Sequence, residues 1–152
     1  MHIIEQIEII AKQEYEKHDS NHQWNHVTEV MNTGLTLAKY YPKTDLEILK
    51  ISIMLHDVIY TKYKTHVDNS ADFAKKLLKK LKYPDNKIDK VIKTIFSHSG
   101  PHRRKFGDAD FIEGKIIYDS DKFRCALSKE GFEKYKLRFY LPETLILIKQ
   151  VK

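Results

Sequence analysis

The sequence predicts an all-α fold, a compact bundle of about six to eight helices. Chain breakers are scarce, with only five Gly and four Pro among 152 residues. Apolar residues recur at helical spacing in most segments, and no segment alternates apolar and polar residues for long enough to make a strand. The length and the 41% of hydrophobic residues suit a single domain over residues 1–152 with one core.

Apolar periodicity gives the order of the helices. It predicts helices over residues 3–17, 24–40, 46–57, 67–82, 88–96 and 111–123, with one or two more before residue 152. The segment 46–57 is apolar almost all round, so we expect it to be the central helix. Thr44 and Glu47 have the spacing of a capping box at its start.

Proline and a polar run mark the expected interruptions of the helices. Pro42 ends the second helix, and Pro142 breaks the carboxyl-terminal part. The segment SHSGPHRRKFGDAD, residues 97–110, is rich in basic residues and is expected to be a loop. Its run Arg103–Lys105 is in most proteins only a solvated surface feature.

Composition limits the classes of function. A lone cysteine, Cys125, forms no internal disulfide, and the first 17 residues read as an amphipathic helix rather than a signal peptide. No apolar run reaches membrane-spanning length. We therefore expect a cytoplasmic protein with no membrane partner. The formal charge of +6 has two explanations, solvated lysine-rich helix faces or attraction to phosphate groups.

Three predicted helices each bring an acid or an imidazole toward the core. His56 and Asp57 end the most apolar helix, and burying both groups is costly unless each finds a strong partner. His26 leads into the apolar face of the second helix, and Asp119 follows the apolar pair Ile116–Ile117. A metal ion would satisfy such groups, because imidazole and carboxylate are common ligands. Asp121 is expected to be a structural hydrogen bonder, and Asn69 a cap of the fourth helix.

These residues resemble the signature of the HD-domain superfamily of metal-dependent phosphohydrolases, which is a His, then a His-Asp pair, then a distant Asp. His26, His56 with Asp57, and Asp119 stand in that order here. The surrounding phrases LHDVIY, IIYDSDKF, VIKTIFSHSG and VDNSADFA are also similar to family segments, and the resemblance covers residues 20–123. Tyr60 stands where some family nucleotidases have a Glu that helps to activate water, and Gln23 stands where related proteins often have an Asp.

The resemblance implies a site and a reaction. One divalent ion (Mn, Fe, Co, Ni or Mg) would bind His26, His56, Asp57 and Asp119, and the substrate would be a nucleotide or a similar small phosphate ester. Asp68 is the candidate catalytic residue in place of the missing Glu. The candidate substrate-binding residues are His98, Lys122 and Lys62. A cationic His98 at a helix end and a snorkelling Lys122 are the structural alternatives.

Two other functions remain open at this point. One is a non-catalytic HD-like module that binds a metal or a nucleotide, which Tyr60 favours. The other is a nucleic-acid-binding helical domain, suggested by the net charge. The second is less favoured because the sequence shows neither a reading helix nor an aromatic stacking platform. The sequence does not indicate an oligomeric state.

Overall fold

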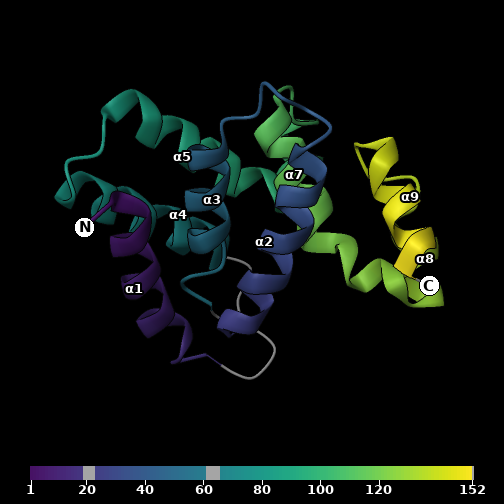
Figure 1. The fold of residues 1–152 in the computed structure, drawn as a ribbon, viewed down its shortest axis with the longest axis horizontal. Coiled ribbons are helices and arrows are strands. Elements are labelled where there is room, and N and C mark those ends of the chain that lie inside the picture. The colour runs from purple at the N-terminus through teal and green to yellow at the C-terminus, as the bar shows by residue number, and fades with distance from the viewer. Residues whose placement is uncertain (19–22, 61–65, 152) are drawn as a thin grey trace.

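The structure is a computed structural model that describes residues 1–18, 23–60 and 66–151, and these residues are helical wherever they are regular (Figure 1). The all-α prediction is confirmed. The helices are α1 (Ile3–Tyr15), α2 (Trp24–Ala38), α3 (Leu46–Leu55), α4 (His66–Lys80), α5 (Asp85–Ser97), α6 (Gly100–Phe106), α7 (Ile112–Phe123), the 3-10 turn η1 (Cys125–Leu127), α8 (Lys129–Tyr135) and α9 (Pro142–Val151).

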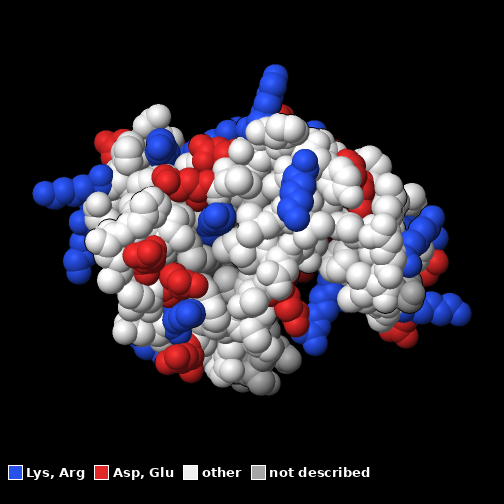
Figure 2. Space-filling view, viewed as in Figure 1, with Lys and Arg blue, Asp and Glu red and all other residues white. Residues whose placement is uncertain are grey.

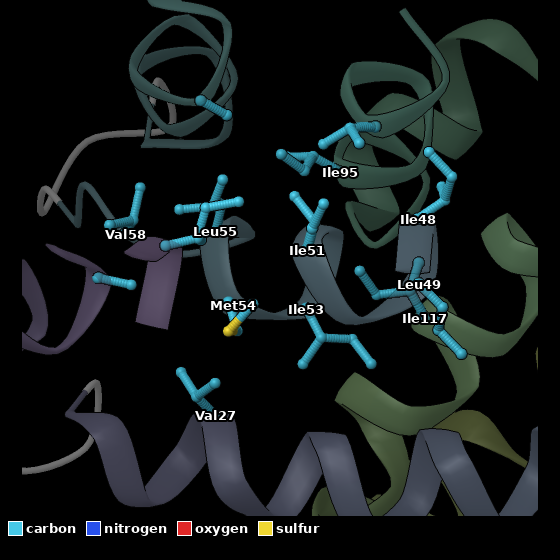
Figure 3. Packing of buried hydrophobic residues seen from close by; sticks show 14 of the residues in the cluster. Val27, Ile48, Leu49, Ile51, Ile53, Met54, Leu55, Val58, Ile95 and Ile117 are labelled. Carbon is cyan, nitrogen blue, oxygen red and sulfur yellow. The ribbon is translucent and has the colours of Figure 1, made fainter. Parts of the chain in front are cut away.

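Helix α3 lies at the centre of the bundle, as its apolar sequence predicts. It contacts α1, α2, α4, α5 and α7, and its residues from Ile51 to Leu55 are all buried. Figure 3 shows Leu55 and Ile51 directed to one side of α3 and Met54 and Ile53 directed to the other, toward Val27 of α2. Apolar side chains on every side of α3 therefore fill the space between the surrounding helices.

Several element boundaries differ from the sequence prediction. Helix α3 is capped by Asp45, whose carboxylate accepts the Ile48 N–H, while Thr44 donates to the Tyr41 carbonyl. Pro142 begins α9 rather than only ending a helix, as its fixed φ and missing N–H allow. Asn69 lies within α4 and not at its start.

The basic segment 97–110 contains a helix, so its prediction as a loop is wrong over residues 100–106. Ser99 caps α6 by accepting the His102 N–H, and Pro101 lies in the first turn, where proline is tolerated. Gly107, with a φ of 91°, ends the helix. The missed signal is the sequence Ser-Gly-Pro followed by five helix-compatible residues and a Gly.

A close approach between α2 and its neighbours depends on Gly34. A Cβ atom at this position would lie 3.0 Å from Ile53 Cδ1 of α3 and 3.3 Å from Ser120 Oγ of α7. Ile53 and Ser120 are buried, so neither has free space into which it can move. The absence of a side chain at position 34 thus lets three helices meet at van der Waals distance.

The surface carries interspersed charges, and Figure 2 shows Lys and Arg side chains scattered among Asp and Glu on the face in view. The longest described helices, α2 and α4, have 15 residues each, fewer than the ~20 that cross a bilayer, and no described helix qualifies as a membrane span.

We predict that Gly34→Leu lowers the free energy of unfolding by about 2–3 kcal/mol, because the new side chain overpacks the contact of α2 with Ile53 and Ser120. Thr28→Leu, at an exposed position of the same helix, is the control and changes it by less than about 0.5 kcal/mol. Urea denaturation of both variants measures the difference. Equal stabilities would show that α2 does not depend on the small residue.

Candidate metal centre

Four side chains from three helices converge on one point inside the bundle. They are His26 in the first turn of α2, His56 at the carboxyl end of α3, Asp57 directly after it, and Asp121 in α7. One ligand atom from each lies within 4.8 Å of the other three. His56 Nε2 and His26 Nε2 are each 3.2 Å from Asp121 Oδ1. His56 is fully buried, whereas the His26 side chain is 21% exposed.

The His56 ring is oriented by its own helix. Its Nδ1 lies 2.6 Å from the Ile53 carbonyl oxygen, which can only accept, so Nδ1 carries the proton and donates. The other nitrogen, Nε2, therefore faces Asp57 Oδ2 at 3.5 Å and Asp121 Oδ1. A hydrogen bond of this kind behind a histidine fixes the tautomer that binds metals in proteins.

His98 supports the cluster from the end of α5. Its Nδ1 donates to the Ile95 carbonyl, and its Nε2 lies 3.3 Å from Asp57 Oδ1. The backbone N–H of Asp57 donates to the hydroxyl of Tyr15, a fully buried residue of α1. Both carboxylate oxygens of Asp57 thus face histidines, while its main chain is held by the first helix.

Lys122 holds the remaining carboxylate. Its Nζ donates to Asp121 Oδ2 at 2.7 Å and to the His98 carbonyl at 2.8 Å. Burial lowers the pKa of Lys122, but the Asp121 carboxylate outweighs it and the pKa is raised. Lys122 therefore stays cationic and joins α7 to the end of α5.

Opposite charges compensate one another in the cluster. Burial disfavours the imidazolium of His56, but the Asp57 and Asp121 carboxylates outweigh it and raise its pKa to about 9. Burial raises the pKa values of Asp57 and Asp121, yet the histidines, together with Lys122 in the case of Asp121, lower both below the usual range. An ion entering here must displace the His56 proton, since only neutral imidazole is a ligand.

The donor set fits a divalent ion. Two imidazole nitrogens and two carboxylate oxygens are a mixed set that suits Mn, Fe, Co, Ni or Mg better than a closed structural zinc site. The two carboxylates are ionised, and a cation would offset their repulsion. On this geometry these four residues could hold the metal.

The structure places Asp121, and not Asp119, in this cluster, which corrects the sequence-based ligand set. The Asp119 side chain lies on a different side of α7 from Asp121 and is fully buried. Its Oδ1 accepts the Tyr140 N–H at 2.9 Å, and its Oδ2 accepts the Leu141 N–H at 2.9 Å and the Thr144 hydroxyl. Burial raises the pKa of Asp119 to about 6 although these donors favour the ionised form. Asp119 thus anchors the start of α9.

Helical spacing puts the two acids on different sides of α7. They lie two residues apart and therefore point about 200° apart on a helix. Asp121 follows Ile117 by four residues and shares its face, and Ile117 packs in the core. Asp119 follows the half-buried Lys115 by four residues and the buried Ile116 by three. Its cover comes from the chain just before α9 and from the first turn of that helix. Both acids therefore follow a buried isoleucine at helical spacing, and the local pattern does not choose between them.

The other site residues predicted from the sequence lie in different parts of the structure. His98 and Lys122 lie at the cluster, as described. Asp68 is exposed in the first turn of α4 and lines a hollow of 340 Å³ together with Ser99 and His102. Lys62 lies outside the described residues.

A groove of 440 Å³ opens directly beside the cluster. Its walls are α2 and the stretch from α7 to η1, and they include His26 and Asp121. The other lining residues are Glu29, Val30, Asn32, Thr33, Ser120, Phe123, Arg124 and Leu127. This volume and this mixture of apolar and polar groups are typical of a site for a small organic molecule.

Comparison with known proteins adds a family and a fold. The family model described as HD domain matches residues 24–125. A predicted HD superfamily hydrolase from an uncultured Thermotogales bacterium has a similar structure, with a TM-score of 0.73 and 21% identity over 96% of this chain and 83% of the other. YpgQ of Bacillus subtilis, solved in complex with ADP, matches with a TM-score of 0.58 and 23% identity over 84% of this chain and 62% of its own. No curated protein matches the chain.

We predict opposite outcomes for the two acids of α7. Asp121→Asn removes a carboxylate from the cluster and lowers the affinity for Mn²⁺ at least about 100-fold, since even outer partners of ligands are worth about 10–100-fold. Asp119→Asn keeps the metal but lowers the free energy of unfolding by about 1–3 kcal/mol, because its buried donors lose an acceptor.

Elemental analysis after Mn²⁺ loading and dialysis, together with urea denaturation, measures both effects. If Asp119→Asn lost the ion while Asp121→Asn kept it, the assignment of the ligands would be reversed.

Proposed function

This chain belongs to the HD-domain family, and from that premise we propose that it is a metal-dependent phosphohydrolase acting on a nucleotide or a similar small phosphate ester. The observation that carries the proposal is the convergence of His26, His56, Asp57 and Asp121 within 4.8 Å. Four groups costly to bury would not gather in the interior for stability alone, since apolar residues fill such a position at lower cost.

We assign those four residues as ligands of one divalent ion. Such an ion supplies Lewis-acid polarisation of a phosphoryl oxygen and a water of lowered pKa. His56 and Asp57 are held by Ile53, His98 and Tyr15, so the donors are fixed before an ion enters. Preorganisation of this kind is what phosphoryl transfer demands, because its catalysis is mostly positioning and charge stabilisation.

Lys122 and His98 receive different roles in this proposal. Lys122 is a positioning residue, because its ammonium is already bound to Asp121 and to the His98 carbonyl. His98 directs Nε2 at Asp57 beside the ion position, and we assign it to binding a phosphate oxygen there. Lys62 remains a candidate phosphate ligand because it follows the His-Asp pair in the sequence.

The groove beside His26 and Asp121 is the proposed position for the organic group of the ester. Val30, Phe123 and Leu127 offer apolar surface, and Asn32 and Thr33 offer hydrogen-bonding groups. A nucleoside has both kinds of surface. The ADP in the YpgQ complex supports a nucleotide as the first class to test. A lone, exposed Cys125 supports the cytoplasm as the location.

A non-catalytic HD-like module is the second candidate. The observation that favours it is Tyr60, which stands where some family nucleotidases have a Glu. Asp68 would replace that Glu in the catalytic proposal. Activity therefore separates the two candidates, whereas metal binding does not.

We predict that the protein releases phosphate from at least one member of a panel of nucleoside mono-, di- and triphosphates and small phosphate esters, with Mn²⁺, Co²⁺ or Mg²⁺ added. Asp121→Asn abolishes this release, and Asp110→Asn, at an exposed acid outside the cluster, leaves it unchanged. Equal phosphate release by the wild type and Asp121→Asn with every ion would refute the enzymatic function.

We also predict that Asp68→Asn lowers kcat by about 10²–10⁴-fold, the usual contribution of a general base, without loss of the ion. Elemental analysis and steady-state kinetics on the same preparations separate these effects. An unchanged kcat would remove Asp68 from the reaction.

A further inference from the structure

A further hollow, on another side of α7 from the groove, has walls rich in arginine. It has a volume of 320 Å³ and lies between α6 and the turn that joins α8 to α9. Its lining residues are Gly100, Arg103, Arg104, Asp108, Tyr118, Leu137 and Arg138. We propose that this arginine pocket binds a phosphate-type oxyanion at a position separate from the ion held by the cluster.

Arg103 is the fixed element of the arginine pocket. Its guanidinium lies over the rings of Tyr140 at 3.9 Å and Tyr118 at 4.8 Å. Its Nε donates to Asp108 Oδ1 at 2.8 Å, and its Nη1 donates to the Arg138 carbonyl at 2.6 Å. Arg103 therefore joins the two walls of the pocket and neutralises its one acid.

Arg104 and Arg138 carry the positive charge of the pocket that Asp108 does not neutralise. Neither forms an ion pair with a carboxylate among the residues that the structure describes. The Arg104 side chain folds back over Gly100, where a Cβ atom would lie 3.3 Å from Nη1. With Arg103 and Asp108 compensating each other, the exposed residues Arg104 and Arg138 give the lining an excess of two positive charges. The Arg138 guanidinium lies 5.9 Å from the Tyr135 ring at the edge of the pocket.

Guanidinium groups favour a particular ligand. Their planar fork matches the oxygens of phosphate and carboxylate, and phosphate presents three or four acceptors with up to two negative charges. An excess of two charges in a pocket of this size corresponds to a phosphate dianion. Arg103 and Arg104 come from the basic segment 97–110, and Arg138 comes from the turn between α8 and α9. Two residues of the run Arg103–Lys105 would thus have a role beyond solvation of a surface.

The arginine pocket is joined to the cluster by one aromatic ring. Lys122 Nζ lies 5.3 Å from the Tyr118 ring, the same ring that Arg103 covers. Lys122 in turn holds Asp121 and the His98 carbonyl. None of the four residues of the cluster lines the arginine pocket, so an anion bound there is separate from the cluster.

The test is a titration of the isotope-labelled, Mg²⁺-loaded protein with inorganic phosphate or with ADP, followed by NMR at constant ionic strength. Phosphate is expected to shift the amide signals of Gly100, Arg104 and Leu137 saturably. The Arg104→Gln, Arg138→Gln double variant is expected to need at least about tenfold more phosphate. The Lys75→Gln, Lys79→Gln variant removes the same charge from exposed positions of α4 and is expected to behave as the wild type.

Each outcome decides the proposal. A response to inorganic phosphate assigns the arginine pocket to free phosphate, and a response to ADP alone assigns it to the terminal phosphate of a nucleotide. No saturable shift at these amides, or an equal response of the arginine double variant, would overturn the proposal. Signals of His56 and Asp121 report the cluster separately, so this result is independent of whether the protein hydrolyses phosphate esters.

Discussion

The packing of α2, α3 and α7 against one another is the constraint on which the site depends. Imidazole and carboxylate groups reach a common point only because the three backbones approach closely, and Gly34 allows that approach. Helix α3 is apolar on all sides and therefore has one position, at the centre of the bundle. His56 and Asp57 follow this helix directly, so they lie in the interior because the residues before them are buried.

Electrostatic compensation makes this arrangement tolerable. Each buried charge faces an opposite charge: Asp57 faces His98 at the end of α5, Asp121 faces its neighbour Lys122 in α7, and His56 faces both acids. A divalent ion would take over part of this compensation by replacing the His56 proton. Protonation of His56 and binding of an ion by the cluster would therefore exclude each other, and the same side chains would compensate the charges in both states.

The sequence was sufficient for the elements with strong periodicity and insufficient where contacts from later segments decide. The helical fold, the central helix and the burial of His56 and Asp57 all followed from apolar spacing. The choice between Asp119 and Asp121 failed because the partners of Asp119 come from residues 140–144, whose position a local pattern does not reveal. Helix α6 was missed because its charged residues lack an apolar face, and the cap of α3 was assigned one residue too early because Thr44 and Asp45 both suit that role.

Tyr15 gives the first helix a part in the cluster without supplying a ligand. Its hydroxyl, held inside the bundle, accepts the backbone N–H of Asp57, and it is the link by which α1 reaches the His-Asp pair. A shift of α1 along its axis would therefore move the backbone and the carboxylate of Asp57. Fusion partners placed ahead of Met1 that pull on this helix would therefore disturb the position of Asp57, so carboxyl-terminal tags are the safer choice for assays.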